Sequence, residues 1–329
     1  MKNYFAPLLK TSTLQFIREA RRTPGFSWFD LLHGLVYARW TYLYIGIGIG
    51  EHPLAKRLKP SVSRLSGLLA SRNGRRVAAS TGVADADFLP PQKPRRTFAD
   101  TYHGKVVPLE SARQLVMVNE DVRLPDLEKI IPYQRARDLI LTNPDHIVVL
   151  DCPCRVSRPD PCLPFDVCLV IGEPFAGYVI EHHPTRSRWI SRQEAVAILE
   201  AEHARGHVHH AFFKDVMLGR FYAICNCCAC CCGAMQAQRN GTPMLTSSGY
   251  IAQVDESLCI GCGDCGEYCQ FQALTIVDYH SQVDFARCMG CGVCVSQCSQ
   301  GAISLERAVE KGEPLEIFAL LEEARQASI

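Results

Sequence analysis

The residues best suited to chemistry in this sequence are its 18 cysteines, which all lie between Cys152 and Cys298. Six of them fall within eight successive positions of the segment CNCCACCCG, residues 225–233. A packed core does not need so many thiols, because alanine or valine can replace a small apolar cysteine. The chain of 329 residues opens without the apolar segment and cleavage site of a secretory signal, which argues against a disulfide scaffold. We therefore expect reduced thiols that bind metal.

Eight of the cysteines belong to an internal duplication. VDESLCIGCGDCGEYCQFQALTI starts at Val254, VDFARCMGCGVCVSQCSQGAISL starts at Val283, and both contain C-x2-C-x2-C-x3-C. Three thiolates at intervals of three residues can wrap a tight loop around one face of a metal cluster, and the interspersed glycines permit the positive φ angles of such a loop. The repeat predicts two similar half-units related by a pseudo-twofold axis.

The duplicated segment resembles the bacterial two-[4Fe–4S] ferredoxin family over about residues 249–305. The resemblance implies a ferredoxin-like βαββαβ domain in which each cluster takes three cysteines from one repeat and the fourth from the other. It assigns one cluster to Cys259, Cys262, Cys265 and Cys298, and the second cluster to Cys288, Cys291, Cys294 and Cys269. The family usually carries proline after each fourth cysteine, whereas Gln270 and Ser299 stand here. We expect this departure to alter the reduction potentials.

The ten remaining cysteines lie upstream of the duplication. They are Cys152, Cys154, Cys162, Cys168, Cys225, Cys227, Cys228, Cys230, Cys231 and Cys232. The first four share a proline-rich loop and are expected to form a tetrahedral thiolate site, unless some are merely buried thiols at strand ends. Ten thiols suffice for one or two additional iron–sulfur centres, with zinc or metal-free thiols as the alternatives. DCPCR and ICNCCACCC also resemble fragments of cysteine-rich iron–sulfur proteins of anaerobes, but that resemblance assigns no chemistry.

The segment with six cysteines raises a question of geometry. If residues 225–232 are helical, Cys225, Cys228 and Cys232 share one face, Cys227, Cys230 and Cys231 share the adjacent face, and Gly233 ends the helix. Three nearby histidines, His207, His209 and His210, are candidate ligands, although core or surface histidines are more common. Arg155, beside Cys154, is expected to be a surface arginine.

The elements that position these cysteines form an α/β pattern over residues 98–248. A helix is expected from Pro132, with Ala136, Leu139 and Ile140 on one face and a turn at residues 143–145. Strands are expected at 146–150 and 167–172. Ser191 and Glu194 form a capping box that opens a helix extending to about Ala204. Residues 249–308 are expected to form the ferredoxin domain, and 309–329 a terminal helix.

The N-terminal 70 residues contain the most apolar stretch, residues 26–50, which is interrupted by Asp30, His33 and Arg39. A basic amphipathic stretch follows, and residues 71–97 read as a linker. Helices of this kind suit docking at a membrane surface or in a partner's groove. The alternatives are a solvated helix beside an ordinary hydrophobic hairpin and a membrane span, which the length argument disfavours. The net charge of +1 gives no reason to expect a nucleic-acid partner.

These features predict a fold that is α+β or α/β, with a helical N-terminal docking region, a cysteine-rich α/β middle domain and a two-cluster domain. Neither G-x-G-x-x-G after a strand nor a P-loop motif is present, so we expect electrons to come from redox partner proteins. The predicted function is single-electron transfer in the cytoplasm, peripheral to the cytoplasmic face of the membrane. The alternatives are an oxidoreductase with a catalytic cluster or redox thiols in the middle domain, and a redox or metal sensor.

Overall fold

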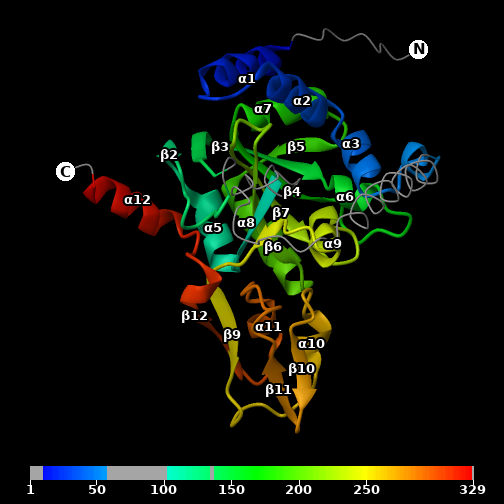
Figure 1. Ribbon diagram of the computed structural model, residues 1–329, viewed down its shortest axis with the longest axis vertical. Coiled ribbons are helices and arrows are strands. Elements are labelled where there is room, and N and C mark those ends of the chain that lie inside the picture. Colours follow the sequence, from blue (N-terminus) through cyan, green and yellow to red (C-terminus); the bar gives the residue numbers. More distant parts are fainter. Residues whose placement is uncertain (1–9, 58–101, 134–136, 328–329) are drawn as a thin grey trace, which may run out of the picture.

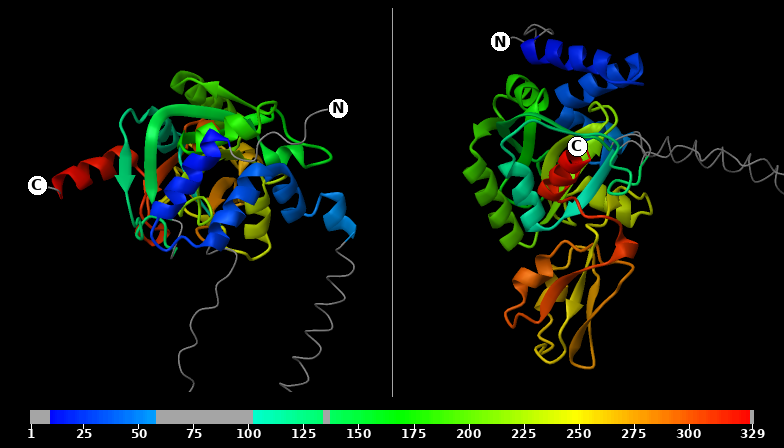
Figure 2. Two further views of the ribbon diagram at one scale, coloured as in Figure 1. Left: turned by 90° about the horizontal axis from the view of Figure 1, so that it is seen from above. Right: turned by 90° about the vertical axis from the view of Figure 1, so that its left-hand side faces the viewer.

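The computed structural model describes residues 10–57, 102–133 and 137–327. The predicted linker, and most of the basic amphipathic stretch before it, lie outside the described residues. At one end of the molecule lie α1 (Thr11–Arg22) and α2 (Trp28–Arg39), and at the opposite end lies a C-terminal lobe (Figures 1 and 2). A mixed α/β body connects them, which confirms a mixed α/β fold with a helical N-terminal region.

An eight-stranded sheet forms the centre of the body, in the order β2-β3-β4-β7-β6-β1-β8 with β5 added on β3. Every strand pair in this sheet is antiparallel except β1 with β8. The strands are β1 (Tyr102–Val107), β2 (Val122–Leu124), β3 (Leu139–Asp151), β4 (Asp166–Glu173), β5 (Ser187–Ile190), β6 (Val208–Lys214), β7 (Arg220–Cys227) and β8 (Leu245–Thr246). The central strands are apolar along most of their length because helices cover both faces of the sheet.

Successive residues of each central strand enter different cores. Phe213 and Ile224 pack on one face with α5 (Leu109–Met117), α8 (Arg192–Ala204) and α12 (Ile317–Gln326). Phe212 and Ala223 pack on the other face with α1, α2, α7 (Phe175–His182) and α9 (Gly233–Arg239). This alternation follows from the two-residue period of a strand. The second face carries the cysteines of β4 and β7.

The helix predicted from Pro132 is wrong, because Leu139–Asp151 is strand β3. Leu139 and Leu141 are buried strand residues that pair with β2, and the strand continues through the predicted segment 146–150. The expected turn at 143–145 is instead an irregularity within β3, where Asn143 has a φ of +50° and the register shifts. Pairing with three neighbouring strands outweighs the helical spacing that the apolar residues also satisfy.

The other predicted elements of the body are confirmed. The segments 146–150 and 167–172 lie in β3 and β4. Helix α8 begins after Ser191, whose side chain accepts a hydrogen bond from the Glu194 N–H at 3.1 Å, and it ends at Ala204. The Glu194 carboxylate pairs with Arg188. The N-cap therefore needs only the serine half of the predicted capping box.

The C-terminal lobe follows the expected order of strands and helices. Its elements are β9 (Tyr250–Val254), α10 (Asp264–Tyr268), β10 (Leu274–Val277), β11 (His280–Val283), α11 (Val293–Gln297) and β12 (Ile303–Arg307). β9 pairs with β12, and β10 pairs with β11. The lobe contacts the body where Ser296 Oγ lies 2.8 Å from His203 Nε2 on α8. A short 3-10 helix, η2 (Val309–Lys311), leads to α12, and α12 returns to the body.

The apolar N-terminal stretch forms α2 and α3 (Thr41–Gly48). Asp30 accepts hydrogen bonds from the Ser27 backbone and side chain, which closes a capping box and starts α2 at Trp28. Among the described residues, no helix combines the length and the apolar character that a membrane crossing requires. Large apolar side chains nevertheless face outward, since Trp28 is 73% and Phe29 74% exposed.

Candidate metal centres

Two hollows in the C-terminal lobe are each lined by four of the cysteines in the duplicated segment. One, which we call the outer hollow, is lined by Cys259, Cys262, Cys265 and Cys298. The other, which we call the inner hollow, is lined by Cys269, Cys288, Cys291 and Cys294. Each hollow thus combines three cysteines of one repeat with the fourth of the other.

Backbone geometry makes both hollows suitable for [4Fe–4S] clusters. Gly261 and Gly290 have positive φ, and an added Cβ there would lie 2.3 and 2.2 Å from backbone carbonyl oxygens, so only glycine fits. The N–H groups of Ala273 and Ala302 donate to the fourth cysteines, Cys269 and Cys298, at 3.2 and 3.3 Å. Such amide donors stabilise negative charge on cluster thiolates.

Burial affects the protonation of two thiols in the inner hollow. Burial raises the pKa of Cys291 to about 12 and also raises the pKa of Cys294. A thiolate is the form that binds metal, and an apolar surrounding disfavours an uncompensated thiolate. A bound cluster would supply the positive charge that makes deprotonation favourable. Four thiols, glycine turns and amide donors therefore fit the group that the duplicated motif implies.

Four other cysteines gather where two loops meet, and we call them the four-thiol site. The ligand atoms of Cys162, Cys228, Cys230 and Cys231 all lie within 4.8 Å of one another. The sulfur atoms of Cys162 and Cys230 are 3.0 Å apart, which is too long for a disulfide bond of about 2.05 Å. Zinc–sulfur bonds of about 2.3 Å in a tetrahedron separate the sulfurs by about 3.8 Å, so the gathering suits one ion.

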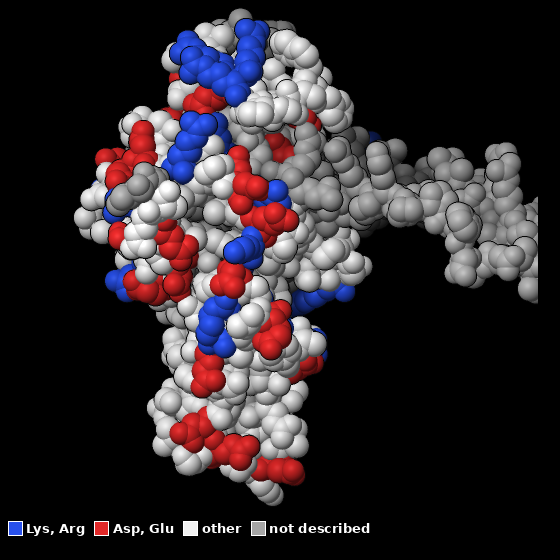
Figure 3. Space-filling model, turned by 60° about the vertical axis from the view of Figure 1, so that its left-hand side comes forward, with Lys and Arg blue, Asp and Glu red and all other residues white. Residues whose placement is uncertain are grey.

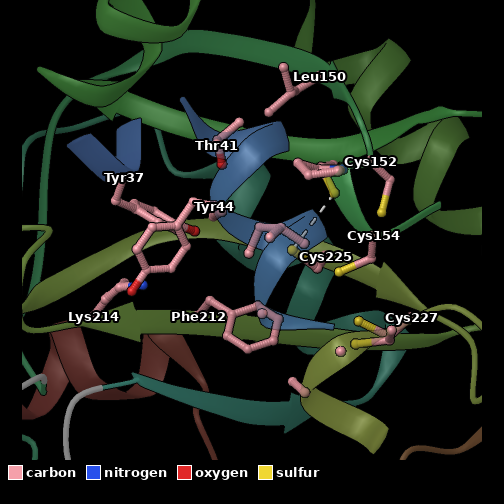
Figure 4. Close-up of a pocket in the computed structure, with 18 of the residues that line it drawn as sticks. Tyr37, Thr41, Tyr44, Leu150, Cys152, Cys154, Phe212, Lys214, Cys225 and Cys227 are labelled. Carbon is pink, nitrogen blue, oxygen red and sulfur yellow. Dashed lines mark hydrogen bonds between the residues drawn. The ribbon is translucent and has the colours of Figure 1, made fainter. Parts of the chain in front are cut away.

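The remaining six cysteines form one side of a cavity in the body, and we call them the thiol wall. They are Cys152, Cys154, Cys168, Cys225, Cys227 and Cys232. Cys168 and Cys225 are register partners of β4 and β7, with their sulfurs 3.8 Å apart. Hydrogen bonds from Cys154 and Cys168 lower the pKa of Cys152, which marks that thiol as the preferred site of negative charge. Figure 4 shows Cys152, Cys154, Cys225 and Cys227 along this side of the cavity.

This division corrects two expectations. Cys162 does not share a site with the other three cysteines of its proline-rich loop, because it turns toward the Cys228–Cys231 region. The segment CNCCACCCG is not a helix: β7 continues to Cys227, a turn follows, and Gly233 opens α9 instead of ending a helix. Strand pairing with β6 places Cys225 and Cys227 on the same face, so the two predicted helical faces do not form.

Arg155 is buried, which contradicts the expectation of a surface arginine. It is 1% exposed and pairs with Glu202 of α8, and it donates to the Pro164 carbonyl at 2.5 Å. His207 Nδ1 lies 2.7 Å from the same Glu202 carboxylate. Burial opposes ionisation of Glu202, but these two partners lower its pKa overall. Arg155 thus fastens the proline-rich loop to α8.

Two of the histidines proposed as candidate ligands, His209 and His210, are buried on β6 among protein groups. His209 Nδ1 lies 2.6 Å from the Asn226 side chain, and Asn226 in turn donates to the Val167 carbonyl at 2.7 Å. His210 is buried opposite Cys225 in the β6–β7 pair. Burial lowers the pKa of His209 to about 4 and of His210 to about 3, so both are neutral near pH 7.

The far end of the cavity holds polar residues that the sequence interpretation missed. Lys214 Nζ lies 3.7 Å from the ring centroid of Tyr37 and 4.9 Å from that of Tyr44 (Figure 4). The Tyr44 hydroxyl lies 2.8 Å from His33 Nε2, and the Tyr37 hydroxyl lies 3.0 Å from that of Tyr222. Burial lowers the pKa of Lys214 to about 7. A lysine at the end of the apolar strand VHHAFFK was the available signal.

The C-terminal lobe also contacts the cysteine-rich body close to its cysteines. Val208 on β6 belongs to a small apolar core with Val293, against which Cys291 of the inner hollow packs. Val208 is also the register partner of Cys227 in the thiol wall. Separately, the Gln270 side chain accepts a hydrogen bond at 2.8 Å from the N–H of Ala229, the residue between Cys228 and Cys230 of the four-thiol site. Residues next to the inner hollow therefore contact residues next to both cysteine groups of the body.

Comparison with known proteins identifies one segment. Residues 258–302 match the 4Fe-4S dicluster domain family, and this segment contains all eight cysteines of the two hollows. Neither the curated proteins nor the solved structures contain a match to the chain. The matched motif and the grouped thiols show that this is an iron–sulfur protein.

Proposed function

We propose that this iron–sulfur protein relays single electrons through two [4Fe–4S] clusters to a further iron–sulfur centre at the thiol wall. The outer hollow holds the first cluster through Cys259, Cys262, Cys265 and Cys298. The inner hollow holds the second through Cys269, Cys288, Cys291 and Cys294. The observation that carries this proposal is the position of Val208, which belongs to the small apolar core on which Cys291 packs and which is also the register partner of Cys227.

The outer cluster is where a redox partner protein exchanges electrons. Cys262 is exposed, whereas Cys288 and Cys294 of the inner hollow are buried. Exposed apolar side chains, Ile260 and Tyr279, lie near it, together with the exposed acidic residue Asp264. Figure 3 shows acidic side chains at this end of the molecule. An apolar contact beside negative charge suits a basic partner surface that docks by electrostatic steering.

The inner cluster passes electrons onward across a short apolar contact. Residues directly opposite in an antiparallel pair present their side chains on the same face, so Val208 and Cys227 are neighbours. Cys291 touches the same core from the lobe. Contacts join Cys152 to Cys154, Cys154 to Cys232 and Cys232 to Cys227. These four adjacent thiols suit a polynuclear cluster.

The four-thiol site has a different role in this proposal. Its compact grouping suits a single tetrahedral ion, and zinc is the usual occupant of a closed four-thiolate site. Such an ion would tie the proline-rich loop, through Cys162, to the turn before α9. Burial opposes ionisation of Cys230, but hydrogen bonds from Cys162, Cys228 and Cys231 lower its pKa overall. The lowered pKa eases the deprotonation of Cys230 that metal binding requires.

Electron transfer along this route is tested by removing the inner cluster. Reduced ferredoxin as a protein donor should reduce the wall centre of the wild-type chain but not that of Cys294→Ser, whereas dithionite, a small reductant, should reduce both. The wall signal in electron paramagnetic resonance is assigned by its loss in Cys154→Ser. Cys162→Ser, in the four-thiol site, serves as the control and should behave as wild type. Unchanged reduction of Cys294→Ser by the protein donor would refute the route.

A second candidate function is an oxidoreductase whose catalytic centre is the thiol wall. The cavity beside the wall favours it, because a simple electron carrier does not need a chamber next to its cluster. In that case the two ferredoxin clusters would supply electrons to a bound substrate. Turnover of a substrate with reduced ferredoxin, lost in both Cys154→Ser and Cys294→Ser, distinguishes this function from transfer to a second protein.

A further inference from the structure

The cavity beside the thiol wall is larger than a cluster needs. Its volume is about 340 Å³, whereas each hollow of the C-terminal lobe measures about 20 Å³. Each small hollow already has the four thiols of a complete cluster site. A cluster of the same size at the thiol wall would therefore leave most of the cavity open. A volume of this size falls within the range of pockets that bind small organic molecules.

The cavity has an apolar middle and two chemically different ends. Phe175, Phe212, Val170 and Leu150 form parts of its sides. The thiol wall lies at one end, and Lys214 with Tyr37 and Tyr44 lies at the other (Figure 4). A ligand that fills this space is therefore mostly apolar, and an oxygen acceptor on it can add a hydrogen bond from the lysine at the polar end.

We propose that this cavity binds a small quinone-class molecule, with one carbonyl oxygen directed to Lys214 and the ring between the aromatic sides. Flat rings suit an aromatic lining, and a carbonyl oxygen accepts hydrogen bonds without carrying a charge into an apolar chamber. A carboxylate would lose far more hydration than the single lysine restores. The inference concerns binding and goes beyond the proposed electron transfer, so either can fail while the other stands.

The elements around the cavity are consistent with an apolar ligand. Helix α3 contributes Tyr44 and Ile45 to the lining, while its Leu43 and Ile47 are exposed on the outside of the molecule. Helix α2 contributes Tyr37 to the lining, and its first turn carries the exposed residues Trp28 and Phe29. The same two helices thus line the cavity and form an apolar outer surface. A lipophilic molecule gathered at that surface would lie close to the chamber.

Calorimetric titration of the metal-loaded full chain tests the inference with two matched probes. Duroquinone is a fully substituted benzoquinone, so it offers no free ring position for thiol addition. Durene has the same ring and methyl groups but no oxygen. We expect duroquinone to bind at least about fivefold more tightly than durene, because a hydrogen bond from Lys214 commonly contributes that much whether or not the amine is charged. Equal affinities, or no binding of either probe, would overturn the proposal.

Three variants locate the binding. Lys214→Met should weaken duroquinone binding to the affinity of durene and leave durene unaffected. Lys105→Met removes another buried lysine, one that donates to the Glu313 carbonyl outside the cavity, and should change neither affinity. Ala223→Leu adds three carbons to a lining position of the sheet and should abolish binding of both probes. Unchanged duroquinone affinity in Lys214→Met or in Ala223→Leu contradicts the assignment, and metal content is measured on each variant.

Discussion

Gln270 stands where two-cluster ferredoxins usually have proline, and its side chain is used to join the lobe to the body. It accepts the Ala229 N–H of the four-thiol site, and its backbone carbonyl accepts from Arg239 at 3.2 Å. Ser299, its equivalent in the second repeat, is exposed, and its hydroxyl accepts a hydrogen bond from the neighbouring Gln300. Of the two residues that replace proline, Gln270 therefore joins the lobe to the body, whereas Ser299 makes only a local contact.

The two positions make a matched pair for a first prediction. Gln270→Pro should increase amide hydrogen exchange in residues 228–232, because the Ala229 N–H loses its acceptor. Ser299→Pro should leave exchange in that segment as it is in the wild type. Mass spectrometry of exchange in the metal-loaded protein measures both. Equal exchange in the two variants would show that Gln270 does not hold the four-thiol site.

Arg155 supports a second prediction. Arg155→Met removes one cation from buried Glu202, which keeps its contacts with His207 and Arg205, so the free energy of unfolding should fall by about 1.5–3 kcal/mol. Arg188→Met removes an arginine of the exposed pairs with Asp166 and Glu194, and should cost at most about 1 kcal/mol. Denaturant titration of both variants provides the comparison. Similar losses would contradict a special role for the buried pair.

For single residues, the sequence predicted the roles of those that belong to a recognisable motif. The grouping of the eight cysteines could be foreseen, because it is what their resemblance to the two-cluster ferredoxin family implies. Arg155 and Lys214 could not be foreseen, because their surroundings come from distant elements: Glu202 is 47 positions from Arg155, and Tyr37 lies on an N-terminal helix. The division of the ten other cysteines also depends on the pairing of β4, β6 and β7.

Among the elements, α12 carries the terminal chain back to the body. Ile317 is fully buried in the core with Leu115 and Val122, whereas Phe318 is about half exposed. Ile317→Ala should lower the free energy of unfolding by about 2–5 kcal/mol through lost burial and a new cavity. Phe318→Ala should change it by less than about 0.5 kcal/mol. If denaturant titration gives both variants the same stability, α12 does not help to hold the body together.

The predictions of helices and strands were correct where the apolar residues followed a single periodicity, that of a helix or that of a strand. Helix α8 has a serine cap and a clear end, and the apolar runs of β3 and β4 are short and rich in valine. Prediction failed at Leu139 and at Cys225, where local spacing allowed a helix but neighbouring strands supplied the pairing. Such pairing involves residues far apart in sequence, so no local pattern could have shown it.

For the whole molecule, the two ends differ in charge and in exposed apolar surface. Basic side chains gather at the α1 end and acidic ones at the tip of the C-terminal lobe (Figure 3). Arg18, Arg21 and Arg22 are exposed near Trp28 and Phe29 of α2. We propose that the α1–α2 end docks on an anionic membrane surface while the lobe remains accessible to its redox partner.

Vesicle flotation tests this orientation. The full chain should bind vesicles containing phosphatidylserine more strongly than neutral phosphatidylcholine vesicles, and added salt should weaken the binding. Replacing Trp28 and Phe29 by serine should reduce binding, whereas Tyr279→Ser, at the far lobe, should not. Binding that ignores lipid charge and both exposed aromatics would contradict docking through this end.

The existence of a third cluster at the thiol wall is tested by the iron, acid-labile sulfide and zinc content of the full chain purified without oxygen. We expect roughly twelve irons and as many sulfides, since three [4Fe–4S] clusters hold four of each, together with about one zinc. The double variant Cys154→Ser/Cys232→Ser should retain about eight irons, and Cys162→Ser/Cys230→Ser should lose only the zinc. About eight irons in both the wild type and the Cys154/Cys232 variant would mean that the thiol wall holds no cluster. The proposed electron route would then end in the C-terminal lobe.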